Sequence, residues 1–86
     1  MNVFFSEKAK KDFEDMPTEL RIIFTKHIEK IACIPPRRHM RYGIPYHVEE
    51  VTKQSRLIYE IKNDNLYLIH CFKEHKEYER WYKSYR

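Results

Sequence analysis

The sequence lacks the features that mark membrane-spanning, exported and metal-binding proteins. No apolar run approaches the roughly 20 residues that a membrane-spanning helix needs, so we expect no membrane association. Residues 1–5 are too short for a signal peptide and are followed by no cleavage site. The 2 cysteines, Cys33 and Cys71, form no CxxC motif, and we expect reduced, buried thiols in a cytoplasmic protein. No His or Cys pair has metal-ligand spacing, so we expect no metal and no cofactor.

Glycine and proline are also scarce, with 1 and 4 residues respectively, and the chain has no low-complexity linker or internal repeat. With 86 residues, of which 42% are hydrophobic and 15% aromatic, residues 1–86 are expected to form a single globular domain. The formal net charge is +4 and the sequence pI is about 9.1. This excess of positive charge suits a polyanionic partner such as nucleic acid, or an acidic protein.

The first part of the chain predicts a strand followed by two helices. Asn2–Phe5 is a short apolar run of β-forming residues, and Ser6 is a good N-cap for a helix that stops at Pro17. Thr18 is expected to cap a second helix, which ends before Pro35. This second helix carries an apolar stripe at helical spacing, formed by Leu20, Ile23, Phe24, His27, Ile28 and Ile31. The pair is expected to form an αα-hairpin that covers a sheet.

The second part of the chain predicts three strands and a last helix. A loop at 35–45 contains Arg37, Arg38 and Arg41, which are candidates for phosphate contacts or simply a solvated connection. The expected strands are Tyr46–Thr52, Ser55–Lys62 and Asn65–Phe72, and the last two are separated by Asn63-Asp64. In the last segment, 74–86, one helical face is aromatic and consists of Tyr78, Trp81, Tyr82 and Tyr85.

The element order is therefore β-α-α-β-β-β-α. Helices gathered before and after the strands predict an α+β fold with a small, mainly antiparallel four-stranded sheet, an N-terminal αα-hairpin and a C-terminal helix. Because the two strands of a hairpin are antiparallel, Arg56 at its start and His75-Lys76 after its end are expected to lie near each other. A cluster of positive charge and imidazole is thus predicted at one edge of the sheet.

Three stretches of the chain resemble the RelE/ParE superfamily of toxins: NVFFSEKAKKDFEDMP, SRLIYEIKNDNLYLIHCF and FKEHKEYERWY. The resemblance implies the toxin of a type II toxin–antitoxin module, bound by a cognate antitoxin and contacting DNA only through that complex. Relatives of the RelE and YoeB type are metal-independent endoribonucleases that cut mRNA, commonly in the ribosomal A site. Relatives of the ParE type share the fold but inhibit DNA gyrase, so this alternative stays open.

The resemblance also implies roles for residues around the hairpin. Arg56 matches the arginine that begins this strand in nuclease relatives, and its planar fork suits a scissile phosphate, although pairing with a carboxylate such as Glu60 is the simpler structural role. His75 matches a histidine of the family's last motif, a residue type that can act as acid or base, and Lys76 stands where arginine is common. Tyr82 matches a tyrosine that stacks on or orients a base in some relatives. Tyr78 is the other candidate for contacting RNA, unless it only packs the last helix.

The chain departs from some nuclease relatives at His47 and Glu49, where those relatives carry lysines. One interpretation is that the nuclease site is weak or absent, and that the protein serves only as an antitoxin-bound partner. The other is that Glu49, which shares a strand face with His47 by alternation, is the general base, and that His75 is the acid.

Overall fold

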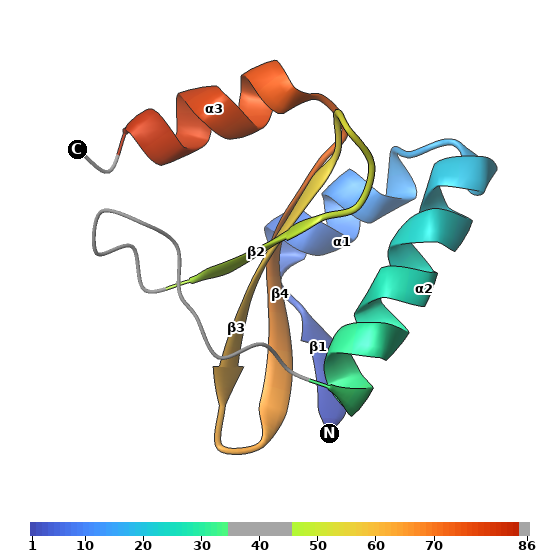
Figure 1. Cartoon of the computed structure of the whole chain (residues 1–86), viewed down its shortest axis with the longest axis vertical. Coiled ribbons are helices and arrows are strands. Elements are labelled where there is room, and N and C mark those ends of the chain that lie inside the picture. The colour runs from blue at the N-terminus through green and yellow to red at the C-terminus, as the bar shows by residue number, and fades with distance from the viewer. Residues whose placement is uncertain (35–45, 85–86) are drawn as a thin grey trace.

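The computed structural model of the chain describes residues 1–34 and 46–84 (Figure 1). Its elements are β1 (Asn2–Phe5), α1 (Glu7–Glu14), α2 (Thr18–Cys33), β2 (His47–Glu50), β3 (Arg56–Lys62), β4 (Asn65–Phe72) and α3 (His75–Lys83). This is the predicted α+β order, and the single sheet has four strands. Within the described residues, no helix is both long and apolar enough to cross a membrane.

The strand order in the sheet is β1-β4-β3-β2, with β1 parallel to β4 and the other pairs antiparallel. β1 pairs with residues 65–68 of β4, and among the described residues no strand continues this pairing along the last part of β4. Helix α1 covers this free edge instead. The Ser6 hydroxyl donates to the Ile69 carbonyl (2.9 Å), and the Asp12 carboxylate accepts from the Cys71 N–H (3.2 Å).

The turn of the β3–β4 hairpin lies at Asn63 and Asp64, whose φ angles are 53° and 63°. Two consecutive positive φ angles match the right-handed twist of the flanking strands, and Asn and Asp tolerate them better than most residues. The polar dipeptide that breaks the two apolar runs in the sequence is therefore the hairpin turn.

The core lies between the sheet and the helices α1 and α2, while α3 lies against the other face of the sheet (Figure 1). The largest fully buried side chains are Phe24, Ile31, Leu57, Ile58, Tyr59, Leu66 and Leu68. Ser6 caps α1 as predicted, because its hydroxyl accepts the Ala9 N–H at 3.0 Å. The first half of the chain is thus mainly a scaffold that supports one face of the sheet.

Several predicted details are wrong at the ends of elements. Thr18 is the first residue of α2 rather than its cap: Pro17 holds the cap position, and the Thr18 hydroxyl accepts from the Arg21 side chain instead. β2 ends at Glu50 rather than Thr52, because the Thr52 hydroxyl accepts the N–H of Ser55 and turns the chain. Both cysteines are free, but Cys33 is exposed and only Cys71 is buried.

Candidate functional site

Arg56 begins β3, directly opposite Glu50 of β2 and Phe72 of β4. Its Nη2 forms an ion pair with Oε1 of Glu50 at 3.0 Å. The carboxylate partner is therefore Glu50 and not Glu60, because cross-strand register places Glu50 beside Arg56. The Arg56 side chain is only 13% exposed, whereas that of Glu50 is 68% exposed.

The second amino group of Arg56 stabilises the connection between β2 and β3. Its Nη1 donates to the carbonyl oxygens of Thr52 (2.9 Å), Lys53 (3.0 Å) and Ser55 (3.0 Å). A guanidinium has several donors in a rigid plane, so these bonds fix its orientation while Nη2 still faces an exposed anion. Arg56 thus has a structural role in the turn and a cationic edge that reaches the surface.

Helix α3 places the ring of Tyr78 over this cation. The Cζ atom of Arg56 lies 5.7 Å from the centroid of the Tyr78 ring, which is within cation–π range. The rings of His75 and Tyr82 contact the Tyr78 ring from either side along the helix, with centroids at 5.7 and 5.0 Å. We call Glu50, Arg56, His75, Tyr78 and Tyr82 the Arg56 site. Arg56 and His75, which hairpin geometry is expected to bring near each other, thus both contact the Tyr78 ring.

Burial raises the pKa of the Tyr78 hydroxyl, as does the neighbouring Tyr82, and these effects outweigh the opposing effect of Arg56. Tyr78 therefore keeps its proton and can donate a hydrogen bond. His75 is half-exposed, and its Nδ1 lies 4.0 Å from Oε1 of Glu79 one turn along α3. Lys76 is exposed in the first turn of the same helix. The site therefore combines cations, a neutral phenol and an accessible imidazole.

Glu49 and His47 lie on the other face of the sheet, against α2. Nδ1 of His27 lies 2.6 Å from Oε2 of Glu49, and the Lys30 ammonium donates to the same oxygen. His47 is 6% exposed and stacks on Tyr59, with ring centroids 5.1 Å apart. Strand alternation separates these side chains from Glu50 and Arg56. The structure thus does not bring Glu49 together with His75, as the sequence-based hypothesis requires.

Glu49 instead makes the packing of α2 on β2 depend on pH. Burial by itself raises the pKa of Glu49, but the hydrogen bonds from Lys30 and His27 outweigh it, so its pKa is lowered in the folded chain. The carboxylate therefore stabilises the fold above its ordinary pKa of 4.5, and this contribution is lost as the pH falls through the lowered value.

Replacing Glu49 by glutamine is expected to lower the free energy of unfolding by about 1 kcal/mol at neutral pH, since Lys30 is largely solvent-exposed. The loss is expected to vanish in acid, where the wild-type carboxylate is protonated as well. Urea unfolding from about pH 3 to about pH 7 measures it. A variant as stable as the wild type at neutral pH would show that these hydrogen bonds contribute nothing.

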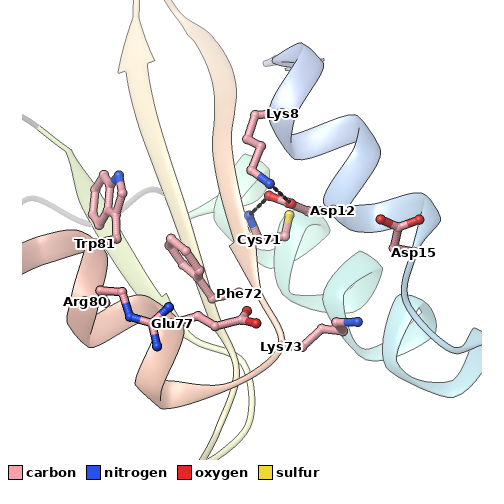
Figure 2. A pocket seen from close by; sticks show the side chains of 9 residues that line it. All are labelled: Lys8, Asp12, Asp15, Cys71, Phe72, Lys73, Glu77, Arg80 and Trp81. Atoms are coloured by element: carbon pink, nitrogen blue, oxygen red, sulfur yellow. Dashed lines mark hydrogen bonds and ion pairs between the residues drawn. The ribbon is translucent and has the colours of Figure 1, made fainter.

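A pocket of about 460 Å³ lies between α1, the end of β4 and α3 (Figure 2). Its floor includes Asp12, whose Oδ1 pairs with Lys8 at 2.9 Å and whose Oδ2 lies 3.4 Å from Nδ1 of His70. His70 in turn stacks on Phe72, with centroids 4.7 Å apart. No motif in the sequence indicates this pocket, because it joins residues about 60 positions apart.

Some of the residues singled out in the sequence lie outside the part of the chain that the structure describes. Arg37, Arg38 and Arg41, together with Tyr85, fall outside the residues that the structure describes. In the described part, no group of three or more His, Cys, Asp or Glu side chains has the arrangement of a metal site.

No known family model matches the sequence, and no curated protein matches it. Solved structures do match. The isolated RelE toxin of E. coli superposes with a TM-score of 0.75 at 17% identity, covering 96% of this chain and 96% of that chain. A YoeB/ParE toxin from Agrobacterium tumefaciens gives 0.72 at 16% identity, covering 84% of this chain and 96% of that chain. The YoeB dimer of Staphylococcus aureus gives 0.72 at 13% identity, covering 86% and 97%. These likenesses show a common fold.

Proposed function

We propose that this chain, which has the RelE-like fold, is the toxin of a type II toxin–antitoxin module and acts as an endoribonuclease. Its substrate in this proposal is mRNA in the ribosomal A site, cut in the cytoplasm without a metal ion. The observation that carries the proposal is the convergence of Arg56, His75 and Tyr78 where β3, β4 and α3 meet. These are the residue types that metal-free RNA cleavage uses.

Arg56 is proposed to bind the scissile phosphate. The exposed Glu50 carboxylate already occupies one edge of the guanidinium, and an RNA phosphate that replaces it meets the same Nη2 group. Because three carbonyls hold Nη1, the guanidinium needs little reorganisation when charge develops on the phosphate. One such preorganised donor is worth roughly 10²–10³-fold in rate.

Proton transfer is assigned to the groups on α3. Cleavage requires a base for the ribose 2′-hydroxyl and an acid for the leaving 5′-oxygen, and each such step contributes roughly 10²–10⁴-fold. The half-exposed His75 imidazole is suited to one of these steps, and the protonated Tyr78 hydroxyl can donate to the phosphate or the leaving oxygen. Lys76 adds positive charge at the helix start, and Tyr82 offers a ring on which a base can stack.

The other residues singled out in the sequence take supporting roles in this proposal. Glu49 and His47 hold β2 against α2 and Tyr59, and transfer no proton. Arg37, Arg38 and Arg41 supply further positive charge for contacts with the RNA backbone. The rate of cleavage is therefore expected to fall with increasing salt concentration.

A cognate antitoxin is the proposed protein partner. Among the structures with this fold are the intact RelBE toxin–antitoxin complex of E. coli and a YoeB–YefM complex from Staphylococcus aureus. The net charge of +4 suits an acidic segment that folds as it binds. Contact with DNA is expected only through that complex.

Replacing Glu50 by glutamine is expected to strengthen RNA binding three- to tenfold, because it removes the carboxylate that competes with phosphate for Arg56. Fluorescence anisotropy with a labelled, non-cleavable 2′-deoxy-substituted RNA measures the affinity. Glu60→Gln also removes one negative charge, but from a β3 residue that is not part of the ion pair, and it is expected to change the affinity less. Equal gains for both variants would show that only net charge matters.

Induced expression in a bacterial host tests the whole proposal. Growth is expected to stop with loss of mRNA, and co-expression of a small acidic protein encoded beside this gene is expected to restore it. Undisturbed growth at confirmed expression of folded protein would contradict the toxin assignment.

A second candidate function is favoured by the contacts that Arg56 makes with Glu50 and three turn carbonyls. If Arg56 only stabilises the turn, a ParE-like inhibitor that binds DNA gyrase without cutting RNA is expected. Growth arrest with intact mRNA and gyrase trapped on DNA would identify it.

A further inference from the structure

We propose that the pocket between α1 and α3 binds a guanine nucleotide, either free or as a residue of RNA. The pocket is formed because β1 leaves the end of β4 uncovered, and α1 and α3 approach this gap from opposite sides (Figure 2). Its volume of about 460 Å³ lies within the range of small-molecule sites. We call it the α1–α3 pocket.

One wall of the α1–α3 pocket is aromatic. Phe72 of β4 and Trp81 of α3 line it, with ring centroids 5.8 Å apart and planes inclined at 46°. Behind them His70 stacks on Phe72 and contacts Trp81 at 5.6 Å, so the rings support one another. Such a wall suits a flat ring, because unpaired bases in RNA complexes commonly stack on aromatic side chains.

The rim of the pocket carries both signs of charge. Lys8 and Asp12 of α1 form an ion pair, and the negative charges of Asp15 and Glu77 also attract the Lys8 ammonium. Within residues 1–34 and 46–84, the structure shows no ion pair for four lining side chains, which are Asp15, Lys73, Glu77 and Arg80. Two carboxylates and two cations are therefore available to a ligand.

This combination of groups selects the ligand. Lys73 and Arg80 attract phosphate, but carboxylates beside them repel a bare polyanion, so the ligand must also carry hydrogen-bond donors. Guanine presents two adjacent N–H donors on its Watson–Crick edge, which one carboxylate can accept side by side. Adenine, cytosine and uracil each present a single donor group there. Glu77, which extends from α3 into the pocket, is the carboxylate best placed to accept them (Figure 2).

The pocket and the Arg56 site are neighbours that meet at Phe72, which lines the pocket, lies opposite Arg56 in the sheet and has its ring centroid 6.1 Å from that of Tyr78. Tyr78 faces Arg56, whereas Glu77, Arg80 and Trp81 line the pocket. An RNA strand that passes the start of α3 can therefore contact both. The RNA form of the inference rests on the proposed function and makes the pocket a determinant of base preference near the cut. Binding of free guanine nucleotide does not depend on cleavage.

Trp81 gives a direct readout, because it is the only tryptophan of the chain (1 Trp). Titration with guanosine 5′-monophosphate is expected to change its fluorescence in a saturable way. The apparent affinity is expected to exceed those for the adenosine, cytidine and uridine monophosphates at least tenfold. Equal affinities for the four nucleotides, or no saturation with any of them, would overturn the inference.

The double variant Asp15→Asn, Glu77→Gln tests the carboxylates. Both residues are exposed, so the fold is expected to persist, and circular dichroism checks this. The preference for guanosine monophosphate is expected to fall below threefold. Glu29→Gln, which removes a carboxylate from the exposed side of α2, is the matched control and is expected to keep the preference. An unchanged preference in the double variant would contradict the proposal that these carboxylates recognise guanine.

Two further measurements test whether the ligand is a free nucleotide or a residue of RNA, and whether guanine binding depends on cleavage. An oligoadenylate RNA with one internal guanosine is compared with the same RNA without it, and tighter binding of the first identifies an RNA residue as the ligand. Binding of guanosine monophosphate without any gain from the internal guanosine identifies the free nucleotide. Arg56→Ala is expected to bind guanosine monophosphate like the wild type, so loss of cleavage and loss of the pocket are separable.

Discussion

Replacing Arg56 by alanine is expected to lower the rate of mRNA cleavage at least 100-fold. Within residues 1–34 and 46–84, the guanidinium is the positive group at the Arg56 site that is held from several directions, by Glu50 and three turn carbonyls. Its loss removes a preorganised donor at the position proposed for the scissile phosphate, an effect of roughly 10²–10³-fold. Cleavage of a reporter mRNA in a purified translation reaction measures the rate.

The same substitution also removes the hydrogen bonds that hold the β2–β3 turn, so folding must be checked independently. Thermal unfolding is expected to show a lower Tm, and the rate is compared at a temperature well below it. Arg56→Lys keeps a positive charge without the planar fork and is expected to lose less activity. Arg21→Ala, an arginine truncation in α2, is the control for nonspecific loss of charge. Cleavage by Arg56→Ala within threefold of the control would contradict the assignment.

Replacing Phe24 by alanine is expected to destabilise the fold by about 3–5 kcal/mol. Phe24 is fully buried in the cluster that α1 and α2 form with the sheet, at 0% exposure. A domain of this size has a total stability of only roughly 4–13 kcal/mol, since proteins gain roughly 0.05–0.15 kcal/mol per residue. A large fraction of the variant is therefore expected to be unfolded at 37 °C.

Tyr59→Phe is the matched control, because it changes a buried aromatic side chain in the same cluster without leaving a cavity. The Tyr59 hydroxyl is buried and has no hydrogen-bond partner among the described residues, and burial is the main reason that its pKa is raised. Removing it is expected to leave stability unchanged or to raise it by about 1 kcal/mol. Urea unfolding compares the two variants. A loss below about 1 kcal/mol for Phe24→Ala would contradict the described core.

The sequence predicts the elements of this fold well because their signals are local. The apolar stripe that includes Phe24 and Ile28 defines α2, and the polar Asn63-Asp64 pair between two apolar runs defines the hairpin turn. Element ends are less predictable, because they depend on single hydrogen bonds. Thr18 is a frequent capping residue, yet here it follows the cap, since proline precedes it.

The candidate site is predicted only in part, because its contacts join distant segments. Hairpin geometry is sufficient to predict that Arg56 and His75 lie near each other, and in the structure both contact the Tyr78 ring. The sequence cannot show which face of β2 meets α2, so it does not separate Glu49 from the site. The α1–α3 pocket is invisible in the sequence for the same reason, since α1 reaches β4 across about 60 residues.

Primer extension on a ribosome-bound reporter mRNA tests the central proposal most directly. After induction of the wild-type protein, new 5′ ends are expected at a fixed position within codons, and Arg56→Ala is expected to abolish them while remaining folded. Growth arrest by the wild type with full-length reporter mRNA and no new ends would contradict the proposal that the Arg56 site cleaves RNA.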